Sequence, residues 1–152
     1  MFVDPVSVDP SLASLAGATL VQDRATMCLT SALAVHGLSD AIPDATDVAL
    51  PRGVRHPSGF GHVVWHSFDV ATFDIGRTPF RTVGDVEVFA YSAERTIIDC
   101  FQLAYREGSD QAHLALRRWL RARRGVPSHL LDMARSFPRV APRIRQALEV
   151  LL

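Results

Sequence analysis

Arginines gather on one predicted helix face in the last third of the chain. Arg117, Arg121 and Arg124 are spaced at i, i+4 and i+7, with Arg118 beside them, and such positions share one side of a helix. A planar guanidinium donates two hydrogen bonds at once, which suits a phosphate or a carboxylate. The face therefore predicts contact with nucleic acid or an acidic protein surface. The alternative is a solvated face that pairs with acidic residues of the same chain. The predicted interaction residues are Arg117, Arg118, Arg121 and Arg124, with Arg143 and Arg145 as outer members.

A second charged pair predicts a structural role. Arg95 and Asp99 are one helical turn apart, and the residues between and after them are largely apolar. Such a pair belongs at the edge of a core. We expect it to hold its helix against the preceding sheet.

Other side chains are weaker candidates for chemistry. His62 and His66 fall on one side of a predicted strand, followed by Asp69, and Asp85 and Glu87 share a face of a later strand. Two histidines and a carboxylate could begin a metal site, but same-face pairs are common on strands. We predict no metal, no cofactor and no catalytic residue. An enzyme that uses these carboxylates and histidines with a metal is the weakest of three hypotheses.

The composition excludes several enzyme classes. All 16 basic residues are arginine, and the chain has no lysine. Phosphate-binding loops of the Walker type and ordinary protein kinases need a lysine on the nucleotide, and Schiff-base enzymes need its amine. The net charge of zero hides a segregation, because residues 1–100 carry a balance of −6 and residues 101–152 a balance of +6.

The remaining composition predicts a cytoplasmic protein that is not a membrane protein. Cys28 and Cys100 stand in apolar surroundings without a CxxC pair, so we expect both to be small core residues. The first ten residues carry two aspartates and no basic cluster, unlike a signal peptide. No apolar run reaches the length of a membrane span.

The elements that position these residues predict an α+β fold. We expect residues 1–25 to form an extended arm, with a short element of uncertain type over 11–21, and residues 26–152 to form one domain. A helix over 26–37 precedes a small antiparallel sheet of about four short strands, because tight turns favour antiparallel pairing. After Tyr91 the apolar period changes from about 2 to about 3.6, with Ser92 as N-cap. The predicted strands are 47–50, 62–68, 71–75, 80–83 and 86–91. The predicted later helices run from Ser92 to Gly108, and over 110–123, 127–137 and 141–152.

Two segments resemble a known family. Residues 28–38, CLTSALAVHGL, resemble the C-L-x-S-A-L-x-x-H-G-L helix of the AbiEi family of antitoxins. Residues 91–101, YSAERTIIDCF, resemble that family's S-x-x-R/K-T-x-x-D-C-F helix. The similarity covers roughly residues 27–152, because the strand ending in Pro51 and the tail also follow in the family's order.

The resemblance implies the antitoxin half of a toxin–antitoxin pair. The partner in such pairs is a nucleotidyltransferase-like toxin, and the antitoxin usually represses its own operon by binding operator DNA through an N-terminal winged helix. Here residues 1–25 are too few for a winged helix. The leading hypothesis is thus a non-enzymatic antitoxin domain. The second is a nucleic-acid-binding transcriptional regulator that acts through its arginine-rich helices.

Overall fold

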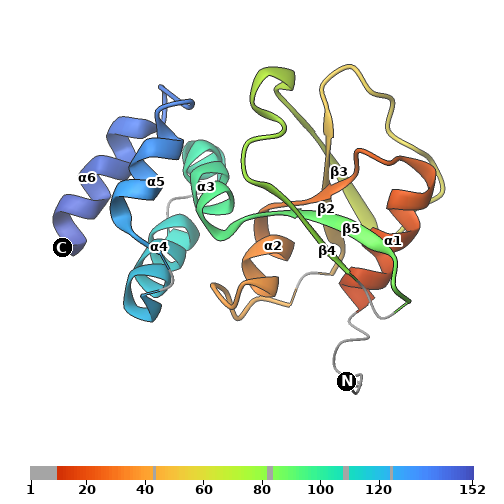
Figure 1. The fold of residues 1–152 in the computed structure, drawn as a ribbon, viewed down its shortest axis with the longest axis horizontal. Helices are drawn as coiled ribbons and strands as arrows, with labels where there is room; N and C mark the ends of the chain where they lie inside the picture. The colour runs from red at the N-terminus through yellow and green to blue at the C-terminus, as the bar shows by residue number, and fades with distance from the viewer. Residues whose placement is uncertain (1–9, 43, 82–83, 108–109, 124) are drawn as a thin grey trace.

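The structure, a computed structural model, describes residues 10–42, 44–81, 84–107, 110–123 and 125–152. The chain is α+β, with a mixed sheet between α1 on one side and the remaining α-helices on the other (Figure 1). The elements follow in the order α1 (Pro10–Val21), β1 (Thr26–Met27), α2 (Leu29–Val35), β2 (Thr46–Pro51), β3 (Val63–Phe68), η2 (Val70–Thr72), β4 (Arg77–Arg81), β5 (Glu87–Tyr91), α3 (Ala93–Glu107), α4 (Asp110–Ala122), α5 (Pro127–Ala134) and α6 (Ala141–Leu151).

The sheet is mixed, so the expectation of purely antiparallel pairing is wrong. Its strand order is β3-β2-β1-β5-β4. Two pairs, β1 with β2 and β4 with β5, are antiparallel, whereas β1 with β5 and β2 with β3 are parallel. The parallel pairing of β2 with β3 is possible because residues 52–62 form a connection long enough to cross over.

The central strand is one that the apolar pattern assigned to a helix. Thr26 and Met27 were expected in the helix over 26–37, but they form β1, and α2 begins only at Leu29. Thr26 pairs with Ala49 on one side and Phe89 on the other. Both β1 residues are fully buried. Pairing on both edges satisfies their backbone groups and outweighs the local helical pattern.

The hairpin before α3 is also shifted from its expected position. The expected strand over 71–75 is instead the end of η2 followed by a turn over 73–76. The N-cap of η2, Asp69, accepts a hydrogen bond from the backbone N–H of Ala71 at 3.0 Å. The expected turn over 76–79 lies mostly within β4. Residues 82–83, at the end of the expected strand over 80–83, lie outside the described residues.

A helix occupies about half of the expected N-terminal arm, including the segment 11–21 whose element type was left open. Residues 10–21 form α1, and residues 1–9 lie outside the described residues. Leu15 and Ala18 are fully buried in a cluster with Val48 and Leu50 of β2. The intervening Ala49 points to the opposite face, into a second cluster. This alternation, which follows from the two-residue period of a strand, gives the sheet an apolar layer on each face.

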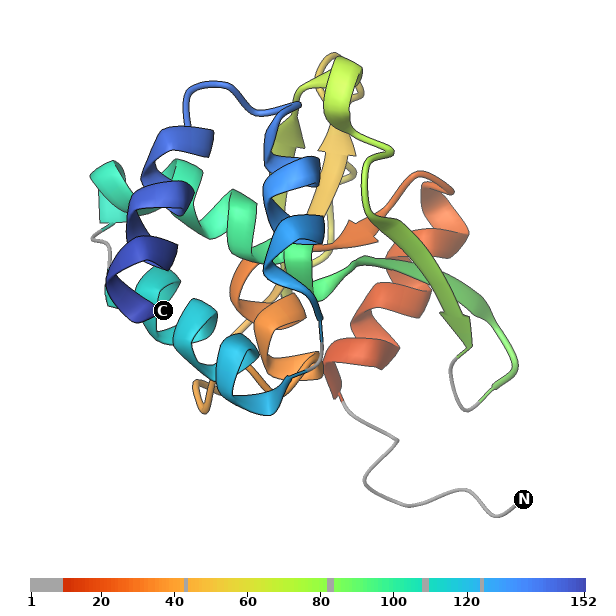
Figure 2. The same cartoon turned by 60° about the vertical axis from the view of Figure 1, so that its left-hand side comes forward.

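The helical half follows the predicted pattern closely. Ser92 caps α3, since its Oγ accepts a hydrogen bond from the backbone N–H of Arg95 at 3.2 Å. Pro127 begins α5, as expected. The helix ends at Ala134, before the end of the expected helix over 127–137. Gly108, the expected end of α3, lies outside the described residues. Figure 2 shows α3 between the sheet and the C-terminal helices. Within the described segments, every helix is too short or too polar to cross a lipid bilayer.

Candidate functional site

The described arginines of α4 differ in their surroundings. Arg118 forms an ion pair with Asp40, with 3.1 Å between its Nη1 and Asp40 Oδ1. This pair joins the basic half to the acidic half and holds the pKa of the Asp40 carboxyl below its usual value. Arg117 and Arg121 are exposed and make no ion pair within the part of the chain that the structure describes. We call these two residues the arginine face of α4.

The other predicted interaction residues are divided among different places. Arg124 lies outside the described residues. Arg143 and Arg145 are exposed on α6. Arg143 is part of the lining of a pocket that also involves α3.

Arg95 and Asp99 form a fully buried ion pair on α3. Arg95 Nε donates to both carboxylate oxygens of Asp99, at 2.9 and 3.1 Å, and the two side chains are 2% and 3% exposed. Arg95 Nη1 also donates to the backbone carbonyls of Thr72, at 2.6 Å, and Ile75, at 2.8 Å. The pair therefore lies inside the core and anchors α3 to the segment between β3 and β4.

Aromatic rings enclose the Arg95 guanidinium. Its central carbon lies 4.2 Å from the ring centre of Tyr91, 4.9 Å from that of Phe137 and 5.6 Å from that of Phe68. Rings attract a cation over their faces, and they also exclude water. Burial raises the pKa of the Asp99 carboxyl to about 6 from its usual 3.8, although Arg95 opposes that rise.

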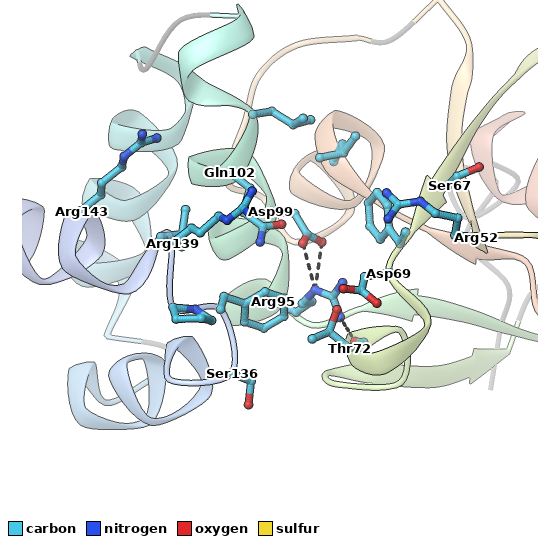
Figure 3. Close-up of a pocket in the computed structure, with 16 residues that line it drawn as sticks. Arg52, Ser67, Asp69, Thr72, Arg95, Asp99, Gln102, Ser136, Arg139 and Arg143 are labelled. Atoms are coloured by element: carbon cyan, nitrogen blue, oxygen red, sulfur yellow. Dashed lines mark hydrogen bonds and ion pairs between the residues drawn. The ribbon is translucent and has the colours of Figure 1, made fainter.

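A pocket of about 800 Å³ opens beside this pair (Figure 3). Its walls come from the end of β3, from α3, and from the connection between α5 and α6. Arg95, Asp99, Leu29, Phe68 and Phe137 line it, and they are buried or half-buried. The exposed charged residues that line it are Arg52, Asp69, Arg139 and Arg143.

Two arginines of this pocket approach from different segments. In Figure 3, Arg52, which follows β2, and Arg139, which precedes α6, extend toward the Arg95–Asp99 pair from opposite sides. Neither side chain forms an ion pair with any described residue. Asp69 also lines the pocket, but one of its carboxylate oxygens already caps η2.

The residues weighed for metal or acid–base chemistry are dispersed. His66 Nε2 lies 3.0 Å from Asp47 Oδ1, His62 is exposed, and Asp69 caps η2. Asp85 pairs with Arg81 at 2.9 Å, and Glu87 is exposed on β5. Among the described residues, no three His, Cys, Asp or Glu side chains come together as metal ligands would.

The two segments that carry the family resemblance pack against each other. His36 Nε2 is 2.8 Å from the backbone carbonyl oxygen of Tyr91, a hydrogen bond in which the ring N–H donates. Ser31 Oγ accepts a hydrogen bond from the backbone N–H of Asp47 at 2.9 Å. Cys28 and Cys100 are buried and unbridged, as expected, and burial raises the pKa of the Cys28 thiol. The hydrogen bonds of Ser31 and His36 therefore connect α2 to β2 and to the end of β5.

The sequence reading missed the pocket. Arg52 follows the proline that ends β2, and Arg139 stands between two helices. Loops at the ends of strands and helices often carry binding residues, so the loop positions of these two arginines were the available signal. The sequence pattern did not predict the order of the strands, and so it could not predict that the two arginines line the same pocket.

Comparison with known proteins adds no relative: neither the family models nor the curated proteins include a match to this chain. The resemblance to the AbiEi antitoxins therefore stays a prediction.

Proposed function

We propose that this chain is a non-enzymatic antitoxin domain of the AbiEi type. It binds a nucleotidyltransferase-like toxin through the arginine face of α4. The observation that carries the proposal is that Arg117 and Arg121 are exposed, one turn apart, and without an acidic partner among the described residues.

The charge distribution supports a protein surface as the target. The acidic half neutralises one member of the α4 set, Arg118, through Asp40. Arg117 and Arg121 remain available to an external anion. A nucleotidyltransferase holds its metal ions with carboxylates, so the mouth of its active site is acidic. Covering that mouth with two guanidinium groups would block both metal and nucleotide.

The packing of the two resembling segments supports the family interpretation. Their characteristic residues Ser31, His36, Arg95 and Asp99 serve as packing and hydrogen-bonding residues. A motif that determines a fold is expected in proteins that share a scaffold and differ in their exposed residues. Recognition of a particular toxin then falls to surface residues such as those of α4.

Co-expression with the product of the adjacent gene tests this proposal. We expect the wild-type chain to restore growth to cells that express the toxin, and Arg117→Glu/Arg121→Glu to lose that rescue. The control Arg55→Glu/Arg81→Glu makes the same change in net charge on the sheet half and should rescue fully. A wild-type chain that gives no rescue and does not alter toxin activity contradicts the proposal.

The second candidate function is operator binding as a transcriptional regulator. It would use the same guanidinium groups, those of Arg117 and Arg121. Phosphate contacts make affinity fall steeply with salt. An electrophoretic mobility shift on the upstream DNA that appears at low salt, weakens as salt rises and vanishes in Arg117→Glu/Arg121→Glu would favour it. Absence of a shift at low salt would rule it out.

A further inference from the structure

The pocket beside Arg95 and Asp99 has the size of a small-molecule site. Its volume is about 800 Å³, within the ~300–1,000 Å³ usual for ligand pockets. Several separate parts of the chain contribute to it: the start of α2, the ends of β2 and β3 with η2, the middle of α3, and the connection between α5 and α6 with the start of α6. The core beneath these parts holds them together.

Its charge favours an anion. Four arginines and two aspartates line it. Arg95 and Asp99 are satisfied by each other. Arg52 and Arg139, by contrast, extend from opposite sides without an ion-pair partner among the described residues. Two planar guanidinium groups facing across a cleft suit a group with several oxygens, such as a phosphate.

Its inner surface is apolar and partly aromatic. Leu29, Phe68 and Phe137 are among the residues that line the pocket. Bases and other flat rings stack on such side chains. Gln102 adds an amide group that can recognise a polar ring edge. A flat organic group attached to a phosphate therefore matches both the apolar floor and the charged rim, whereas inorganic phosphate would use the rim alone.

We propose that this pocket binds a nucleotide, with its phosphate between Arg52 and Arg139 and its base against the half-buried Phe68. The site is separate from the arginine face of α4, since Arg117 and Arg121 are not among its lining residues. It therefore gives the chain a small-molecule ligand in addition to any macromolecular partner.

Isothermal titration calorimetry of the purified full chain tests the proposal directly. The probes are nucleoside mono- and triphosphates, with adenosine and inorganic phosphate as partial ligands. We expect a nucleotide to bind more tightly than either partial ligand. Arg52→Gln/Arg139→Gln should weaken nucleotide binding at least about tenfold, because each change removes a charge-assisted contact. Both side chains are exposed, so the variant should keep the wild-type melting temperature.

The matched control is Arg117→Gln/Arg121→Gln, which removes the same charge outside the pocket and should leave nucleotide affinity unchanged. Equal weakening in both double variants would show general electrostatic attraction and overturn the proposal. So would binding of none of these nucleotides at millimolar concentration, or preferential binding of an acidic peptide. Arg52→Gln/Arg139→Gln should still rescue cells from the toxin, so failure of this inference and failure of the antitoxin proposal are distinguishable.

Discussion

A single buried guanidinium connects three segments of this protein. Arg95 joins Asp99 one turn along α3, reaches two backbone carbonyls before β4, and lies against Phe137 between α5 and α6. An arginine at this position pairs with a buried carboxylate and donates to two backbone carbonyls, of which that of Thr72 also accepts from the N–H of Ile75. Its removal would leave the Asp99 carboxylate without its charged partner in the core.

Arg95→Met is therefore expected to lower the free energy of unfolding by about 3–5 kcal/mol, the usual consequence of removing one partner of a buried ion pair. Chemical denaturation at neutral pH measures it. Arg81→Gln is the control, because Arg81 and Asp85 form an exposed i,i+4 pair, and it should change stability by less than about 1 kcal/mol. Comparable losses in the two variants would mean that Arg95 is not the anchor described here.

Asp99 gives stability an unusual dependence on pH. Its pKa is about 6 in the folded chain against a usual 3.8, so between these values the folded state holds more protons than the unfolded state. Its contribution to the free energy of unfolding therefore falls as pH rises from about 4 to 6, and then levels off. The gap corresponds to a change of the order of 3 kcal/mol.

Asp99→Asn isolates this contribution, because the amide stays neutral at every pH. The free energy of unfolding of the wild type minus that of the variant should decrease between pH 4 and pH 7. A difference that stays constant or increases would contradict the raised pKa. The carboxyl carbon resonance of Asp99 gives an independent reading, with an expected midpoint near pH 6.

Gly76 permits the close approach of the β3–β4 segment to α3. Its φ is +75°, and a Cβ there would lie 2.6 Å from Arg95 Cβ and 3.0 Å from Ser92 Oγ. Gly76→Ala should therefore lower the melting temperature, with a cost of about 1–3 kcal/mol from strain and crowding. Gly61→Ala, where a Cβ meets nothing within 4 Å, should have little effect. Equal behaviour of the two alanine variants would count against the close packing of this turn.

At the level of elements, the sequence predicted helices better than strands. Ser92 and Pro127 mark helix starts through local chemistry, and the apolar period of α3 and α4 extends over several turns. The two residues of β1 carry no such period, and their conformation depends on β2 and β5, which lie far along the chain. Parallel pairing likewise depends on distant contacts that no local pattern records.

The N-terminal helix shows the same limit. Residues 11–21 are apolar and short, a pattern that leaves a helical turn and a strand both open, yet α1 covers one face of the sheet. Leu15→Ala should lower the free energy of unfolding by about 2–5 kcal/mol, because Leu15 is fully buried. Leu20 is 80% exposed, and Leu20→Ala should be nearly neutral. Thermal or chemical unfolding would refute the role of α1 as a packed layer if the two variants were equally stable.

The charge segregation is a feature of the whole molecule. The acidic and basic halves meet through Arg118 and Asp40, but Arg117 and Arg121 remain unpaired within the described segments. Spacing alone could place these arginines on one face of a helix. It could not show which of them the acidic half already uses, and it could not assemble Arg52 and Arg139 around one pocket, because both depend on how distant segments fold together.

Whether α4 presents a binding surface is decided most directly by the affinity of the purified chain for the nucleotidyltransferase-like protein of the adjacent gene. Calorimetry should detect a complex with the wild type and with Arg55→Glu/Arg81→Glu, and a loss of affinity of at least about a hundredfold in Arg117→Glu/Arg121→Glu, since reversal turns two attractive contacts into repulsive ones. Equal affinity of the α4 variant and the wild type, or no complex at all, would contradict the central claim.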